Sequence, residues 1–277
     1  GAAFHPPAAA LAHRLGGERR GFAMSVYITG GTLGFALGPL LFAPVADRFG
    51  LEWTPLLAAL GLAVVAFFLR RIPPVPLQYA SSGGLSALRP YARPLGLLYA
   101  IVVLRTLTSL GFATFLPVML TRRGLSVAQA GVAVSLYLFG SGIGGFLGGP
   151  AADRYGARRV IAWSLVVSCP FLLAAPFLHG AAFAVVLALG GLFLQSTLPV
   201  NVTFGQSIAP VSAATVSSLM MGFAWGTGGL SVPFVGLAAD RFGIERTLVG
   251  LALVPLLAAA AAIPLPPHAT ARVPVVR

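Results

Sequence analysis

Charged residues are scarce in this chain of 277 residues, and lysine is absent altogether. Only 9% of the residues are charged, against about 25% in a typical soluble domain, whereas 57% are hydrophobic and the mean hydropathy is +0.91. This composition excludes an ordinary soluble globular protein and predicts one that is embedded in a membrane. Apolar stretches of about 20 residues, which suffice to cross a hydrocarbon core of about 30 Å, recur along the chain.

Cysteine and acidic residues are also rare. The single cysteine, Cys169, lies in an apolar run, which excludes an internal disulfide and gives no support for a metal site. All six carboxylates lie near the ends of apolar runs, and HExxH, an aspartate-rich metal motif and paired carboxylates within a span are missing. A membrane-embedded enzyme therefore has little support beyond composition, and we expect no metal and no cofactor.

The net charge of +12 comes from arginines that are spread over the ends of apolar runs instead of forming one basic stripe. We therefore expect them to orient the protein in a lipid bilayer and not to bind nucleic acid. One set of loops carries twelve arginines (Arg14, Arg19, Arg20, Arg70, Arg71, Arg89, Arg93, Arg154, Arg158, Arg159, Arg272 and Arg277) and the other carries five (Arg48, Arg122, Arg123, Arg241 and Arg246). The positive-inside rule predicts that the first set faces the cytoplasm.

Apolar windows predict eight complete transmembrane spans that follow a partial one. The partial span lies near 1–13, and the complete spans lie near 21–45, 53–70, 95–119, 127–150, 159–178, 180–202, 214–238 and 246–264. Lipid offers no partner for backbone polar groups, and the runs are too long for the alternating strands of a barrel. The predicted fold is therefore an all-α, polytopic transmembrane helical bundle.

A charged cluster occurs twice in almost the same form. Residues 46–54 read "ADRFGLEWT" and residues 239–247 read "ADRFGIERT", with seven of nine residues identical. The spans that carry them are six crossings apart and run in the same direction, as in secondary transporters built from duplicated parallel bundles with the substrate site between the halves. We expect an N-terminally truncated chain that lacks about three and a half spans of its first bundle. Residues 1–70 would end that bundle, 71–94 would link the bundles, and 95–277 would form the second six-helix bundle and a tail.

The segment 148–159, "GGPAADRYGARR", places an aspartate and arginines between two spans. The positive end of a neighbouring helix and a nearby arginine can hold a carboxylate there, so the loop could lock one conformational state. A plain positive-inside loop is the alternative reading. Its residues Gly149, Asp153, Arg154, Gly156 and Arg158 resemble the signature cytoplasmic loop of the major facilitator superfamily, apart from Ala157, where that family usually has a basic residue. The resemblance implies that Asp153 and Arg154 meet the helix that starts near 212–215 in the outward-facing state.

Glycines recur four residues apart in two spans. In "GFALGPL" (34–40), Gly34, Gly38 and Pro39 resemble a motif of drug:proton antiporters in the same superfamily, although Phe42 and Ala43 replace its trailing glycines. Such glycines let a neighbouring helix approach closely, and the proline bends the span, so we expect this motif to seal one end of the transport pathway. We interpret Gly140, Gly144 and Gly148 of a later span as tight packing.

Several polar residues lie inside spans and are candidates for a substrate site. Arg105 lies close to the middle of the 95–119 span, with Thr108 and Ser109 expected on its face. A central arginine costs at least about 2.5–3.5 kcal/mol on insertion scales, so it should bind substrate, face a cavity or pair with another helix. His5, Gln195 and Asn201 could line the same cavity or simply bridge helices.

Three segments resemble the fosmidomycin-resistance branch of the major facilitator superfamily: residues 2–39, 104–117 ("LRTLTSLGFATFLP") and 222–243 ("GFAWGTGGLSVPFVGLAADRFG"). The resemblance implies a monomeric, multi-pass exporter of the bacterial inner membrane that is driven by protons and acts on a small molecule. An anionic substrate would suit Arg105. A solute uptake symporter of the same superfamily is the alternative.

Overall fold

The computed structural model describes residues 20–71 and 85–266, together with Ala8 and Leu11, and its regular elements are all helical. The longer helices are α2 (Arg20–Phe49), α3 (Ala58–Arg71), α4 (Ala92–Arg122), α5 (Val127–Tyr155), α6 (Ala157–Ala174), α7 (Gly180–Gln195), α8 (Thr197–Ile208) and α12 (Ile244–Ala262). Short 3₁₀ segments flank them: η2 (Leu51–Leu57), η3 (Leu85–Tyr91), η4 (Ala175–Phe177) and η5 (Pro210–Ser212). The predicted fold class is confirmed.

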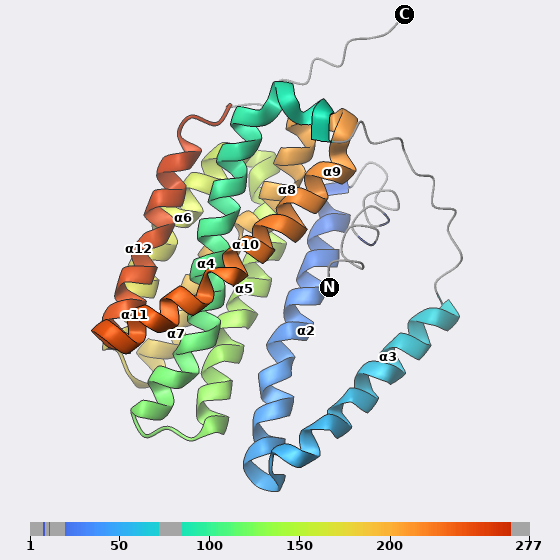
Figure 1. Cartoon of the computed structure of the whole chain (residues 1–277). Coiled ribbons are helices and arrows are strands. Elements are labelled where there is room, and N and C mark those ends of the chain that lie inside the picture. The colour runs from blue at the N-terminus through green and yellow to red at the C-terminus, as the bar shows by residue number, and fades with distance from the viewer. Residues whose placement is uncertain (1–7, 9–10, 12–19, 72–84, 267–277) are drawn as a thin grey trace, which may run out of the picture.

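Helices α4 to α8 pack together with α12 into one bundle, and α2 lies along α5 (Figure 1). Helix α3 diverges from this bundle after η2, and none of its residues is buried. Seven described helical stretches are long and apolar enough to cross a membrane. Their exposed leucine, valine and phenylalanine side chains suit a lipid environment, where an apolar surface needs no protein partner.

The expected span at 214–238 is not one continuous helix, so the prediction of eight uninterrupted spans is wrong here. It consists of α9 (Ala213–Ser218), the π-helical η6 (Leu219–Phe223), α10 (Ala224–Leu230) and α11 (Val232–Phe242), with a turn at Ser231. Four glycines between 222 and 229 weaken the helix, and Pro233 has no N–H to donate to the preceding turn. These residues explain why the span is broken although its hydropathy is high.

The repeated "ADRFG" cluster is a device that ends helices. Gly50 follows α2, and Gly243 follows α11, with φ angles of 92° and 87°. Gly156 ends α5 in the same way after "ADRY", with φ of 89°. Glycine adopts this region without the steric penalty of a side chain, so the chain turns there and starts the next helix at once. In all three copies the arginine lies over the ring of the next residue: Arg48 over Phe49, Arg154 over Tyr155 and Arg241 over Phe242.

One face of α5 touches the backbone of α7. A Cβ atom added to Gly140, Gly144 or Gly148 would lie 2.1, 1.9 or 1.8 Å from a carbonyl oxygen of α7. The three oxygens belong to Ala188, Leu192 and Ser196, which have the same four-residue spacing. Close approach of this kind replaces the hydrophobic effect as the source of helix association in lipid. The prediction that these glycines serve tight packing is confirmed.

A second face of α5 packs against α2. A Cβ on Gly142 would lie 2.8 Å from Cδ2 of Leu33, and one on Gly131 would lie 2.9 Å from Cβ of Ala43. By contrast, no described atom lies within 4 Å of a Cβ added to Gly34 or Gly38. Helix α2 continues through Pro39. The sealing role expected of the Gly34–Gly38–Pro39 motif is therefore not seen among the described residues and stays a prediction.

Replacing Gly144 with alanine should destabilise the bundle, because the new methyl group meets the Leu192 carbonyl, which cannot move without shifting α7. We expect a loss of at least about 1–3 kcal/mol, as for overpacked cores. Gly34→Ala is the matched control, since the same methyl group enters open space on α2. Thermal unfolding of the two variants in detergent measures the difference. Equal midpoints would show that the α5–α7 contact is looser than the structure indicates.

Candidate functional site

Arg105 lies in the middle of α4 and is the largest of the fully buried side chains among the described residues. Its Nη1 donates a hydrogen bond to Oε1 of Gln195 on α7, and its Nη2 donates to Oγ1 of Thr106 at 3.0 Å. The guanidinium carbon lies 5.9 Å from the ring centroid of Trp225 on α10. Three helices therefore meet at one guanidinium group.

Gln195 extends this contact into a small polar network. Its Nε2 donates to Oγ of Ser109 at 3.1 Å, so one amide joins Arg105 to a residue one turn further along α4. Tyr137 of α5 is fully buried, and its ring stacks on that of Phe112, which lies two turns further along α4 than Arg105. We refer to Arg105, Ser109, Tyr137, Gln195 and Trp225 as the Arg105 site.

The positive charge of the Arg105 site is not neutralised within the described chain. The one ion pair between described residues joins Arg123 to Glu245, and Arg105 takes part in none. Its partners are an amide oxygen, a hydroxyl group and an indole ring, which solvate a cation but carry no negative charge. A charge buried without a counter-charge is costly in a low-dielectric interior. The Nε atom of Arg105 and the hydroxyl group of Tyr137 also have no hydrogen-bond partner in the described residues. The site can therefore still bind a hydrogen-bond acceptor that carries negative charge.

The structure brings together some of the residues predicted for this site and separates others. Ser109 and Gln195 join Arg105, as expected. Thr108 does not: its hydroxyl group donates to the carbonyl oxygens of Leu104 and of Leu251 on α12. Successive helical residues are 100° apart, so Thr108 and Ser109 leave α4 on opposite sides of Arg105. Thr108 is therefore outside the hydrogen-bond network of Arg105, and its proposed role in binding substrate stays a prediction.

The remaining two predicted site residues are not part of the network. Asn201 is buried on α8, and neither its Oδ1 nor its Nδ2 has a hydrogen-bond partner among the described residues. His5 lies outside the described residues. The cavity role proposed for each of them stays a prediction.

Sequence reasoning missed Tyr137 and Trp225. Both are aromatic residues within apolar runs, where packing is the ordinary explanation. The signal that could have identified them is their potential to interact with a cation or an anion through a ring face or a hydroxyl group. That signal has meaning only once the neighbouring helix is known.

The predicted switch loop lies at the C-terminal end of α5. Asp153 and Arg154 are exposed, and Asp153 forms no ion pair or hydrogen bond with described residues. Gly149 is half-buried, Gly156 ends the helix, and Arg158 donates to the carbonyl oxygen of Leu265 at 3.1 Å, which ties the start of α6 to the end of α12. No ion pair or hydrogen bond joins Asp153 to the described residues at the start of α9, and the expected contact stays a prediction.

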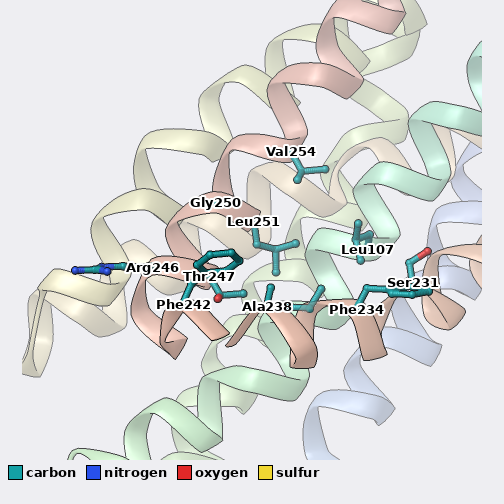
Figure 2. Close-up of a pocket in the computed structure, with 11 residues that line it drawn as sticks. Leu107, Ser231, Phe234, Ala238, Phe242, Arg246, Thr247, Gly250, Leu251 and Val254 are labelled. Atoms are coloured by element: carbon teal, nitrogen blue, oxygen red, sulfur yellow. The ribbon is translucent and has the colours of Figure 1, made fainter. Parts of the chain in front are cut away.

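An apolar groove of about 690 Å³ lies between α4, α11 and α12 (Figure 2). Leu107, Phe234 and Leu251 are among the residues that line it. Its two hydroxyl groups, on Ser231 and Thr247, donate to carbonyl oxygens of their own helices at 2.9 Å. In Figure 2 the side chain of Arg246 extends away from the other lining residues. The groove thus offers few polar groups to a ligand, whereas the Arg105 site does.

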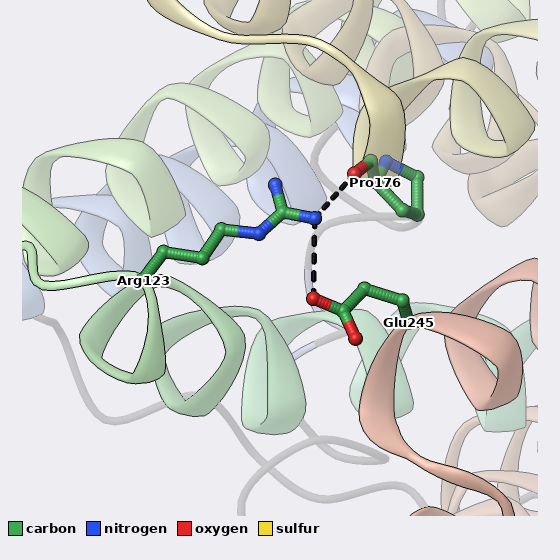
Figure 3. Close-up of polar contacts among 3 residues, drawn as sticks. All are labelled: Arg123, Pro176 and Glu245. Carbon is green, nitrogen blue, oxygen red and sulfur yellow. Dashed lines mark hydrogen bonds and ion pairs between the residues drawn. The ribbon is translucent and has the colours of Figure 1, made fainter.

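Three helix ends meet at Arg123, which follows α4 (Figure 3). Its Nη2 donates to the carbonyl oxygen of Pro176 in η4 and forms an ion pair with Oε1 of Glu245 at 3.4 Å. The end of α4, the end of α6 and the start of α12 therefore share one end of the bundle. Among the residues that the structure describes, no cluster of three histidine, cysteine or acidic side chains could hold a metal ion.

Comparisons with known proteins agree with this architecture. A family model described as Major Facilitator Superfamily matches residues 1–127 and 97–274. The chain is 31% identical to an uncharacterized MFS-type transporter, YfnC, of Bacillus subtilis, over 92% of this chain and 66% of that protein. It is 29% identical to the fosmidomycin resistance protein of Escherichia coli, over 92% of this chain and 65% of that protein. The chain thus spans just under two thirds of the length of these relatives.

A solved structure of the Escherichia coli fucose:proton symporter FucP, carrying the N162A substitution, shares the fold. The TM-score is 0.66, and the match covers 94% of this chain and 72% of that one at 16% identity.

Replacing Arg123 with alanine should destabilise the protein more than replacing Glu245 with glutamine. The first change leaves the Pro176 carbonyl without its donor and costs about 1–3 kcal/mol. The second weakens a pair whose side chains are 20% and 50% exposed, worth at most about 1 kcal/mol. Thermal unfolding in detergent compares the two variants. A larger loss from Glu245→Gln would mean that the ion pair, and not the carbonyl contact, holds this end of the bundle.

Proposed function

Because the chain belongs to the major facilitator superfamily, we propose that it is a secondary active transporter that moves a small anionic solute by alternating access. The observation that carries this proposal is the buried charge of Arg105, which has no counter-charge among the described residues. In a membrane-embedded bundle such a charge is retained where it meets a ligand or a pathway for ions. A negatively charged group on the solute would supply the missing counter-charge.

The donors that remain at the Arg105 site favour an oxyanion. The Nε–H group of Arg105 can only donate, and the hydroxyl group of Tyr137 can donate as well. A carboxylate, phosphate or phosphonate oxygen accepts such bonds, and a bond to arginine would be charge-assisted. Binding would then give hydrogen-bond partners to two buried groups, the Nε–H group of Arg105 and the hydroxyl group of Tyr137.

The site is closed in this conformation, since Arg105 and Tyr137 are fully buried. A solute can reach it only when helices of the bundle move apart, as alternating access requires. The broken span from α9 to α11 suits such a movement, because a π turn and a glycine-rich segment resist bending less than a continuous helix.

Export driven by a proton gradient is the direction we propose. The fosmidomycin resistance protein of Escherichia coli is among the similar proteins, and its name is that of an antibiotic resistance determinant. The second candidate is uptake together with protons, which the name of the fucose:proton symporter FucP suggests. We place the protein in the inner membrane of a bacterium, as a monomer.

Replacing Arg105 with glutamine should reduce transport at least tenfold, because the solute loses its counter-charge, while insertion into the membrane is retained. The protein, reconstituted in proteoliposomes with an imposed pH gradient, is assayed with fosmidomycin as the probe. Arg122→Gln is the matched control, since Arg122 lies on the same helix but is exposed at its end. Transport by Arg105→Gln at the rate of this control would refute the role of Arg105.

The sign of the gradient distinguishes the two directions in the same assay. Accumulation of fosmidomycin in vesicles with an acidic lumen indicates exchange for protons, and accumulation in vesicles with an alkaline lumen indicates movement together with protons.

Replacing Asp153 with asparagine should slow the transport cycle and leave solute affinity within about twofold of the parent protein. The residue is exposed and lies near one end of α5, remote in sequence from the Arg105 site, so it can act only on the equilibrium between conformations. The maximal rate and the half-saturating concentration of fosmidomycin, measured together, separate these effects. An equal loss of affinity and rate would argue against a conformational lock.

A further inference from the structure

Trp225 occupies the boundary between the Arg105 site and the outside of the bundle. The other four residues of the site are buried, whereas Trp225 is only half-buried. One side of its ring faces the guanidinium group of Arg105, with 5.9 Å between the guanidinium carbon and the ring centroid. The indole therefore covers a charge that is otherwise enclosed by protein.

Trp225 also belongs to a second, separate group of contacts. Met24 and Ile28 of α2 and Leu198 of α8 form a small apolar cluster apart from the main core, and Trp225 packs against it. This cluster joins α2 to α8 and, through Trp225, to α10. Trp225 thus contacts a charged group within the bundle and also the apolar cluster between α2 and the rest of the bundle.

The local backbone determines where Trp225 points. The π turn of η6 ends at Phe223, two residues before Trp225. A π turn holds one residue more than an α turn, so the residues after it are rotated by roughly 100° relative to a continuous α-helix. Without this turn, Trp225 would leave the face of Arg105. The π turn is therefore part of the arrangement and not an incidental distortion.

Tyr99 of α4 holds this segment in place. Its hydroxyl group is hydrogen-bonded to Oγ1 of Thr227 at 2.7 Å and donates to the carbonyl oxygen of Phe223 at 3.5 Å. Gly228 lies so close to α4 that an added Cβ would be 2.8 Å from Cβ of Thr106. Contacts on both sides of Trp225 thus fix α10 against the helix that carries Arg105.

We propose that Trp225 is the cover of the Arg105 site and determines which groups reach it. Access requires the indole to leave the guanidinium group and the Met24–Ile28–Leu198 cluster together, so opening of the site and loosening of α2 are one event. An arriving anion competes with the indole for the same cation, because the charge attracts an oxyanion more strongly than a ring face. This inference rests on the proposed function for the nature of the ligand, whereas the covering role can be tested without a substrate.

The test measures how fast a thiol reagent reaches the site. Ser109 is replaced with cysteine in a Cys169→Ala background, which leaves one thiol in the chain, next to Gln195. The purified protein in detergent reacts with 2-sulfonatoethyl methanethiosulfonate, an anionic reagent, and intact mass records the rate. Adding Trp225→Ala should increase that rate at least tenfold. A rate within twofold of the parent would overturn the proposal.

Two further variants show whether a faster reaction comes from loss of the cover or from general unfolding of the protein. Tyr99→Phe keeps the ring of Tyr99 and removes its two hydrogen bonds, so it should loosen α10 and raise the rate several-fold. Trp163→Ala is the matched control, because Trp163 is 68% exposed on α6 and covers nothing in the site. If Tyr99→Phe and Trp163→Ala leave equal rates, the positioning of the cover by Tyr99 is refuted.

The charge of the reagent separates the cover from the proposed function. A cationic, anion-binding site predicts that the sulfonate reagent reacts faster than its trimethylammonium counterpart, and that Arg105→Gln removes this preference. A preference for the anion without an effect of Trp225→Ala contradicts the cover and supports the anion-binding site. A faster reaction of both reagents in Trp225→Ala, without any preference, supports the cover and contradicts the anion-binding site.

Discussion

The direct contact between the backbones of α5 and α7 is the constraint on which the candidate site depends. Gly144 and Gly148 allow the carbonyl oxygens of α7 to approach closer than any side chain would permit. The last of these contacts is to Ser196, the residue after Gln195, so it fixes the end of α7 that reaches Arg105. A Cβ on Gly191 would likewise lie 2.3 Å from the carbonyl oxygen of Tyr137. In lipid, where apolar surfaces do not drive helices together, such contacts decide the arrangement of a bundle.

This packing gives Arg105 polar neighbours but no counter-charge within the part of the chain that the structure describes. Gln195 and Thr106 hold two of its nitrogen atoms, and Trp225 covers its face, but the charge persists. A carboxylate in the same place would form a stable pair and leave little for a ligand to gain. Neutral partners keep the guanidinium group of Arg105 oriented, and they leave its charge available for the anionic solute that we propose. In this conformation the amide of Gln195 and the ring of Trp225 contact the guanidinium group where water would otherwise solvate it.

Glycines also determine where several of the helices end. Gly50, Gly156 and Gly243 end three helices with the same backbone geometry, and each is followed directly by the next helix. Long loops are thereby avoided at these corners, and the preceding arginine lies over an aromatic ring instead of entering the apolar region. The repeat in the sequence is thus visible as a repeated corner in the structure. Its companion aspartates carry charge at the surface, where a lock between conformations could form.

The amino-acid sequence by itself determined the membrane environment, the helical class, most of the span positions and the presence of an arginine in the middle of one span. These follow from hydropathy and from the cost of a buried charge, which depend on composition along one helix. It also identified Gly140, Gly144 and Gly148 as packing residues, because their four-residue spacing has one strong structural explanation.

The tertiary structure decided which side chains meet Arg105. Ser109 joins it and Thr108 turns to α12, a difference of 100° around one helix that becomes meaningful only when the neighbours are placed. Trp225 and Tyr137 enter the site from other helices, and a π turn sets the direction of the first. Patterns of hydropathy specify which face of a helix is apolar, whereas the partner of each polar atom depends on how whole helices pack, and that is a property of the assembled bundle.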